Sequence, residues 1–90
     1  MYAVLTSVSV ESGHEDEART VLEQNIVPRV RELPGAIAGY WLEPQPGQGY
    51  STVVFDSEDN ARAAADLVPG RLPDFVTPNL VQVQEVIAHF

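Results

Sequence analysis

The stretch LPGAIAGYWLE, Leu33 to Glu43, decides the fold because a helix ends in it and a strand begins in it. Pro34 cannot continue a helix, and it biases Leu33 away from the helical region of backbone space. Gly35 is free to take the positive φ that a tight reversal requires. We therefore predict a helix that ends near residue 33 and a strand over residues 36–43.

The sequence before this stretch predicts a strand followed by the start of a helix. Residues 2–10 alternate, and the more apolar row consists of Tyr2, Val4, Thr6, Val8 and Val10. Ser12 and Glu15 fit the capping box S-x-x-E, in which each side chain bonds an amide of the first helical turn. The strand is therefore expected to lead directly into a helix that begins beside Ser12.

The first helix is predicted to be long and interrupted. Apolar residues from Ala18 to Leu33 repeat at three and four positions, which is typical of a helix that packs one stripe against a sheet. Pro28 has no amide hydrogen to donate to the carbonyl of Gln24. We expect a kink or a break near Asn25.

The rest of the chain predicts two strands, a second helix and two loops. Asp56 and Ser57 are good N-caps for that helix. Pro and Gly residues mark the loops. The expected elements are a hairpin loop over residues 44–49, a strand over 50–56, a helix over 58–68, a loop over 69–79 and a strand over 80–90.

The order βαββαβ predicts a ferredoxin-like α+β domain over residues 1–90. Right-handed crossovers give a four-stranded antiparallel sheet in which the fourth, first, third and second strands lie side by side, with both helices on one face. Regular alternation places Tyr40 on the helix-facing side, in a row with Thr6, Val8, Val53 and Phe55. The opposite face would then expose an apolar row, for which we expect a second copy of the chain as cover. The expected interface residues are Leu5, Ile37, Trp41 and Val54.

Composition excludes several classes of function. The formal net charge is −8, and such a surface repels nucleic acid and anionic lipid. The chain has no cysteine and only two histidines, which lack metal-ligand spacing, so we predict no metal site. No stretch approaches membrane-spanning length, and no signal peptide is recognised. We expect a cytoplasmic protein without a membrane or nucleic-acid partner.

Three segments resemble the dimeric α+β barrels related to antibiotic biosynthesis monooxygenases. They are the acidic helix start Ser12–Glu17, the Leu-Pro-Gly turn that leads to Gly39-Tyr40-Trp41, and the segment Val53–Asp59 before an alanine-rich helix. The resemblance covers nearly the whole chain. It implies a homodimer whose sheets form a barrel, with a ligand cavity between sheet and helices in each subunit. Ala36 stands where the family often has an aromatic residue, which implies extra room.

The resemblance also implies a choice between two chemistries. The family's cofactor-free branch oxidises aromatic compounds with dioxygen, and it needs only an apolar slot with polar anchors. Its haem-degrading branch has an asparagine where Thr6 stands, a tryptophan where Phe55 stands and a histidine shortly after the second helix, and this chain has none of them. We therefore expect no cofactor and an aromatic small molecule as the substrate of a monooxygenase-like protein.

The alternative is a non-catalytic dimeric module that binds a small ligand or has its cavity filled by its own side chains. Tyr40 is either a core residue or the polar anchor of the cavity. His14 and His89 are either exposed residues or groups of the site, and Phe75 belongs to a loop that would act as a lid. The candidate pocket residues are Thr6, His14, Tyr40, Phe55, Phe75 and His89.

Overall fold

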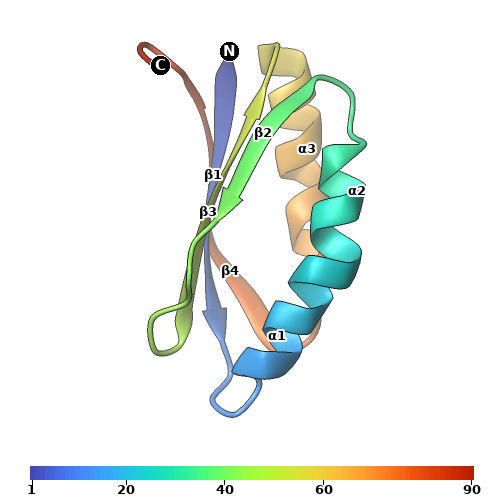
Figure 1. The fold of residues 1–90 in the computed structure, drawn as a ribbon, viewed down its shortest axis with the longest axis vertical. Helices are drawn as coiled ribbons and strands as arrows, with labels where there is room; N and C mark the ends of the chain where they lie inside the picture. Colours follow the sequence, from blue (N-terminus) through green and yellow to red (C-terminus); the bar gives the residue numbers. More distant parts are fainter.

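The computed structural model describes all 90 residues and contains one four-stranded antiparallel sheet. In chain order, the elements are β1 (Tyr2–Val10), α1 (Glu15–Val21), the π-helical turn η1 (Leu22–Ile26), α2 (Val27–Arg31), β2 (Ala36–Trp41), β3 (Gln48–Phe55), α3 (Glu58–Arg71) and β4 (Val76–Glu85). The strand order β2-β3-β1-β4 confirms the predicted topology. All helices lie on one side of the sheet, and no helix covers the other side (Figure 1).

The interruption predicted in the first helix is a π-helical turn. η1 ends at Ile26, and α2 begins with Val27 and Pro28. The amide of Val27 donates to the carbonyl of Leu22, five residues earlier. A π turn widens the helix by one residue, and this one lies directly before the proline that cannot donate to Gln24. The helix is thus irregular near Asn25 as predicted, but as a local widening of a continuous helix and not as a break.

Only one of the two hydrogen bonds of the predicted capping box forms, and the bond to Ser12 is the missing one. The N-cap of α1 is His14, and no side chain caps the helix there. The carboxylate of Glu15 still reaches back, and it accepts from the amide of Gly13 at 2.9 Å. At α3 the prediction is confirmed, since the hydroxyl of Ser57 accepts from the amide of Asn60 at 3.2 Å.

The boundaries of α3 and β4 differ from the prediction. α3 continues through Pro69 to Arg71, because a proline in a last turn removes only one hydrogen bond. β4 begins at Val76 instead of residue 80 and includes Pro78. β4 is an edge strand, and Pro78 lies where the register with β1 shifts between Ser7 and Val8. Edge strands and bulges are the places where a sheet tolerates proline.

A second irregularity inverts the predicted faces of β2. Ala36 pairs with Phe55, whereas Ala38 pairs with Val54, so β2 contains one extra residue between them. A single inserted residue moves every later side chain to the opposite face of the sheet. Trp41 therefore lies on the helix side, opposite Ser51, and Tyr40 points away from the helices with 63% of its surface exposed. The predicted orientations of these two aromatic residues were wrong.

The core lies between α3 and the centre of the sheet. Four buried residues, Val4, Val53, Phe55 and Ala61, form one cluster, and both Phe55 and Ala61 are fully buried. The small side chain of Ala61 lets α3 pack closely on β1, β3 and β4, while α2 packs on β2. α1 packs less closely on the strands than α2 and α3 do. None of the helices has the length and apolar character needed to cross a bilayer.

Candidate ligand-binding site

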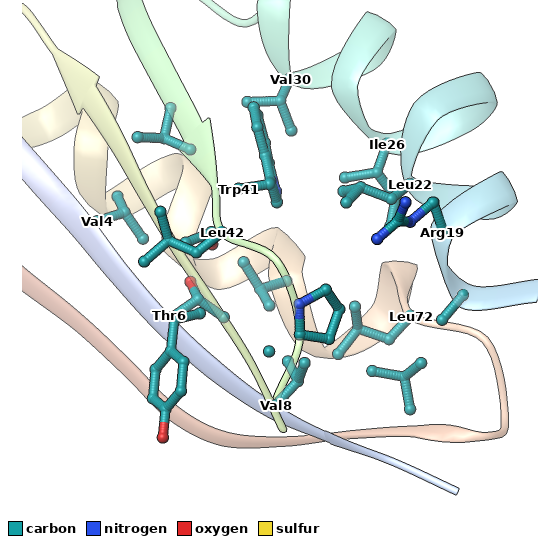
Figure 2. Close-up of a pocket in the computed structure, with 18 of the residues that line it drawn as sticks. Val4, Thr6, Val8, Arg19, Leu22, Ile26, Val30, Trp41, Leu42 and Leu72 are labelled. Atoms are coloured by element: carbon teal, nitrogen blue, oxygen red, sulfur yellow. The ribbon is translucent and has the colours of Figure 1, made fainter. Parts of the chain in front are cut away.

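An apolar pocket occupies the space between the sheet and the helical segment formed by α1, η1 and α2. Its volume is about 320 Å³, and 17 of its 25 lining residues are hydrophobic. This volume is at the lower end of the ~300–1,000 Å³ that is usual for ligand sites. The helical wall consists mainly of Leu22, Ile26 and Val30, which face β1 and β2 across the pocket (Figure 2). The site is therefore suited to a small apolar ligand.

Two hydroxyl groups lie on the sheet side of this apolar pocket. Thr6 on β1 and Ser51 on β3 are register partners, and both line the pocket. Side chains of directly opposed residues in an antiparallel pair lie ~4.5–5.5 Å apart at their Cβ atoms. Neither hydroxyl takes part in the side-chain hydrogen bonds of the protein. They are thus available to bind one polar atom of a ligand.

Trp41 forms the aromatic wall of the pocket. Its partner on β3 is Ser51, which places the indole beside the hydroxyl pair. Figure 2 shows the ring reaching from the end of β2 toward Val30. The ring also lies over the backbone of Gly39, where an added Cβ would be 2.7 Å from Cζ3 of Trp41. The absence of a side chain at Gly39 is therefore what lets the indole lie along the strand.

A salt bridge joins the two sides of the pocket at its rim. Arg19 of α1 donates to the carboxylate of Glu43, which follows β2, and both residues line the pocket. The two side chains remain largely exposed, at 48% and 71%. An exposed pair of this kind contributes only ~0–1 kcal/mol. It links α1 to the chain after β2 without fixing the rim rigidly.

A second cavity lies on the other side of Trp41, between α2 and β2. It has a volume of about 250 Å³, and its lining includes Val27, Arg31, Ala36 and Gly39. Three residues, Val30, Trp41 and Val53, line both cavities. The two cavities are therefore neighbours that share one wall.

The structure brings together only part of the predicted set of pocket residues. Thr6 and Phe55 line the pocket, and Phe55 also anchors the core. His14 and Phe75 stack on each other outside it, with ring centroids 4.8 Å apart and planes inclined by 14°. His14 also bonds Glu17 at 3.1 Å. Phe75 thus packs against the N-cap of α1, outside the lining of the pocket.

Two further predicted pocket residues lie away from the site. Tyr40 points to the face without helices because of the bulge in β2. β4 ends at Glu85 and not at residue 90 as predicted. His89 therefore belongs to the exposed segment that follows β4. The pocket therefore contains no histidine, and the aromatic residues of its lining are Trp41, Tyr50 and Phe55, without Tyr40.

The predicted interface residues are also divided by the bulge. Leu5 and Val54 are on the face without helices, since their neighbours Val4 and Val53 face the core. Ile37 is 54% exposed and lines the second cavity. Trp41 belongs to the pocket side and not to that face.

Some residues of the site were missed from the sequence although a signal for them existed. Ser51 alternates with Val53 and Phe55, and this pattern places its side chain on the helix side of the sheet. The register of β3 with β1 then sets it opposite Thr6. Gly39 inside a strand is a known sign of a bulge or of a close approach. No sequence pattern indicates that Arg19 and Glu43 belong to the site, because their contact depends on how far α1 lies from the sheet in the folded chain.

Known structures resemble this fold over nearly the whole chain. No model of a protein family matches the chain, and no curated protein matches it by sequence. A structure of a proposed antibiotic biosynthesis monooxygenase from Deinococcus radiodurans has a TM-score of 0.78 and 21% identity, and the match covers 100% of this chain and 96% of that one. SnoaB from Streptomyces nogalater, a cofactor-independent oxygenase solved as a point mutant, has a TM-score of 0.77 and 15% identity, with coverage of 98% and 94%.

A third similar structure holds a bound porphyrin. It is a mutant of MhuD with two manganese protoporphyrin IX molecules bound per active site, and it has a TM-score of 0.75 and 15% identity, with coverage of 100% and 98%. Identities this low establish the fold and leave the chemistry to the residues of the pocket. The chain thus adopts the ferredoxin-like α+β fold of the antibiotic biosynthesis monooxygenase-like proteins.

Proposed function

We propose that this protein is a cytoplasmic homodimer that oxidises a small hydroxylated polycyclic aromatic compound with dioxygen and without a cofactor. The observation that carries the proposal is the apolar pocket with the hydroxyls of Thr6 and Ser51 side by side on its sheet wall. A similar fold in SnoaB, a cofactor-independent oxygenase, supports the same chemistry.

The pocket is assigned three tasks. Its apolar walls exclude water, and the indole of Trp41 offers a flat surface on which an aromatic ring stacks. Thr6 and Ser51 donate hydrogen bonds to an oxygen of the ligand, and these bonds are stronger in a dry site than in water. Together these contacts orient the ligand and stabilise negative charge on that oxygen.

The proposed reaction converts a methylene between two aromatic rings into a carbonyl. The methylene lies across the central ring from a carbonyl, and it loses one proton to water to give an enolate. The negative oxygen of this enolate is the former carbonyl oxygen, and Thr6 and Ser51 bind it. The enolate is oxidised by dioxygen, which is reduced. One oxygen atom forms the new carbonyl, and the other leaves as water with the two hydrogens of the methylene.

The experiment is to titrate a hydroxyanthrone and its hydroxyanthraquinone product against the wild-type protein, and to follow binding and oxygen uptake separately. We expect saturable binding and the uptake of one dioxygen for each quinone formed. The variants Thr6→Val and Ser51→Ala remove one hydroxyl each, and each should weaken binding by about tenfold, as expected for the loss of ~1–1.5 kcal/mol. Uptake that stays at the rate of the protein-free solution would contradict the oxidation.

A second copy of the chain is the proposed cover of the bare sheet face. The single chain exposes 6067 Å², whereas a monomer of 9.8 kDa is expected to expose about 5,200 Å². The excess is close to the ~800 Å² that each partner buries in an ordinary interface. Tyr40 and Leu80 are on the bare face, and Ile87 and Phe90 extend beyond β4 with more than nine-tenths of their surface exposed. These residues supply the apolar area that a dimer would bury.

The second candidate is a binding module without turnover. One observation favours it: neither histidine lines the pocket, and the carboxylates that do, Glu23 and Glu43, belong to its helical side and rim. Such a protein would bind the quinone and the anthrone with similar affinity and would leave oxygen consumption unchanged. The same titration therefore separates the two candidates.

A further inference from the structure

We infer that Trp41 is the partition between two binding cavities and that its side chain sets the longest ligand the protein accepts. The inference rests on the pocket of the proposed function, but it does not depend on the oxidation. It assigns the 250 Å³ cavity between α2 and β2 as an extension of the ligand site that is closed by one side chain.

The lining of the two cavities locates the partition. Only Val30, Trp41 and Val53 belong to both. Val53 is a buried residue of the sheet, and Val30 contributes from α2 above it. Trp41 has by far the largest side chain of the three. Figure 2 shows it filling the distance between β2 and Val30. Removal of the indole would therefore leave little to separate the cavities.

The position of the partition is set by Gly39. An added Cβ there would be 2.7 Å from Cζ3 and 2.9 Å from Cη2 of the indole, and Gly39 itself lines the second cavity. The indole thus lies along the boundary between the cavities, over Gly39. Any residue other than glycine at position 39 would collide with the ring. The bulge at the start of β2 completes the arrangement, because without it Trp41 would point to the bare face.

Both cavities are apolar, so the extended site suits a long apolar ligand. The second cavity has one charged residue in its lining, Arg31. Wild-type protein should accept only ligands that fit within the first 320 Å³. A variant without the partition should accept ligands that pass from the hydroxyl pair to the α2 side.

The test uses straight-chain alcohols of increasing length, which probe the length of the cavity and cannot be oxidised by the proposed reaction. Affinity is measured by calorimetry with the 90-residue chain. Each added methylene should tighten binding about fourfold, the factor that corresponds to ~0.8 kcal/mol, until the chain fills the cavity. We expect this gain to stop at a shorter alcohol in wild type than in Trp41→Ala.

Two further variants keep the test independent of the stability of Trp41→Ala. Val30→Ala opens the partition from the helix side and should also move the limit to longer alcohols. Leu22→Ala enlarges only the first cavity, because Leu22 does not line the second. When Trp41→Ala is added to Leu22→Ala, it should therefore still move the limit to longer alcohols, as it does in wild type. Circular dichroism checks that each variant is folded.

The outcomes separate this inference from the proposed oxidation. The same limiting length in wild type, Trp41→Ala and Val30→Ala would overturn the partition. Binding of no alcohol to any of the proteins would overturn it together with the pocket. A shifted limit in a protein that neither binds anthrones nor consumes oxygen would support the partition and contradict the proposed function.

Discussion

A Cβ atom on Gly39 would lie only 2.7 Å from Cζ3 of Trp41, so the indole occupies the space that any other side chain at this position would need. Gly39→Ala must therefore displace the ring from the pocket wall. We expect a loss of ~1–3 kcal/mol in the free energy of unfolding, which is typical of overpacking. Urea denaturation measures it.

The matched control is Gly70→Ala. Gly70 is in α3, where an added Cβ meets no atom within 4 Å. In a helix this change should be neutral or stabilising by up to ~1 kcal/mol. Equal effects of the two substitutions would show that the ring does not rest on Gly39.

Gly35 makes a similar prediction for the turn before β2. Its φ is +78°, and an added Cβ would collide with Oδ1 of Asp56 and Nδ2 of Asn60, which bond each other at 2.9 Å. Gly13 has a φ of +90° with no atom within 4 Å of an added Cβ. Gly13→Ala should therefore cost only the ~1–2 kcal/mol of a left-handed backbone. Gly35→Ala should cost at least ~1 kcal/mol more, since the hydrogen bond is also lost. A thermal melt of both variants tests the difference.

The two serines before the helices should respond differently to alanine. Ser57 caps α3 through the amide of Asn60, so Ser57→Ala should destabilise the protein by ~1 kcal/mol. Ser12 makes no cap bond at α1, and Ser12→Ala should change the free energy of unfolding by less than ~0.5 kcal/mol. A comparable loss in Ser12→Ala would restore the capping box that the sequence suggests.

If the bare sheet face is the dimer interface, a charged side chain placed on it should reduce the mass in solution from that of a dimer to that of a monomer. Wild type should sediment at twice 9.8 kDa. Leu5→Glu places a carboxylate at the centre of the face without helices, where burial against a partner would be costly. We expect this variant to sediment as a monomer at micromolar concentration. Ala63→Glu on the exposed side of α3 should remain dimeric. Wild type that sediments as a monomer would contradict the interface.

The topology of this protein was predictable because the order of its strands and helices restricts the crossovers, and because β1 and β3 alternate regularly. The sequence predicts two rows on the helix side, Thr6 with Val8 on β1 and Val53 with Phe55 on β3. The structure places all four residues there. The proline at residue 28 also located the interruption of the first helix. These features depend on local spacing and on the chemistry of single residues.

The aromatic wall of the pocket was not predictable by the same means. Regular alternation from Ala36 predicts Tyr40 on the helix side of the sheet. The extra residue before Ala38 instead places Trp41 on that side and Tyr40 on the opposite face. The insertion is decided by the pairing with β3 and by the fit of the indole over Gly39, which are tertiary effects. The start of β4 was missed for a related reason, since Pro78 is tolerated only because β4 is an edge strand with a shifted register.

The fluorescence of Trp41 reports whether a ligand occupies the apolar pocket that this residue lines. Trp41 is the only tryptophan of the chain, so no other indole contributes. Titration with a hydroxyanthraquinone should quench its emission to saturation at one ligand per chain, and Thr6→Val should shift the curve to higher ligand concentration. Binding detected by calorimetry without any saturable change in Trp41 emission would place the ligand elsewhere and contradict a ligand site at Trp41.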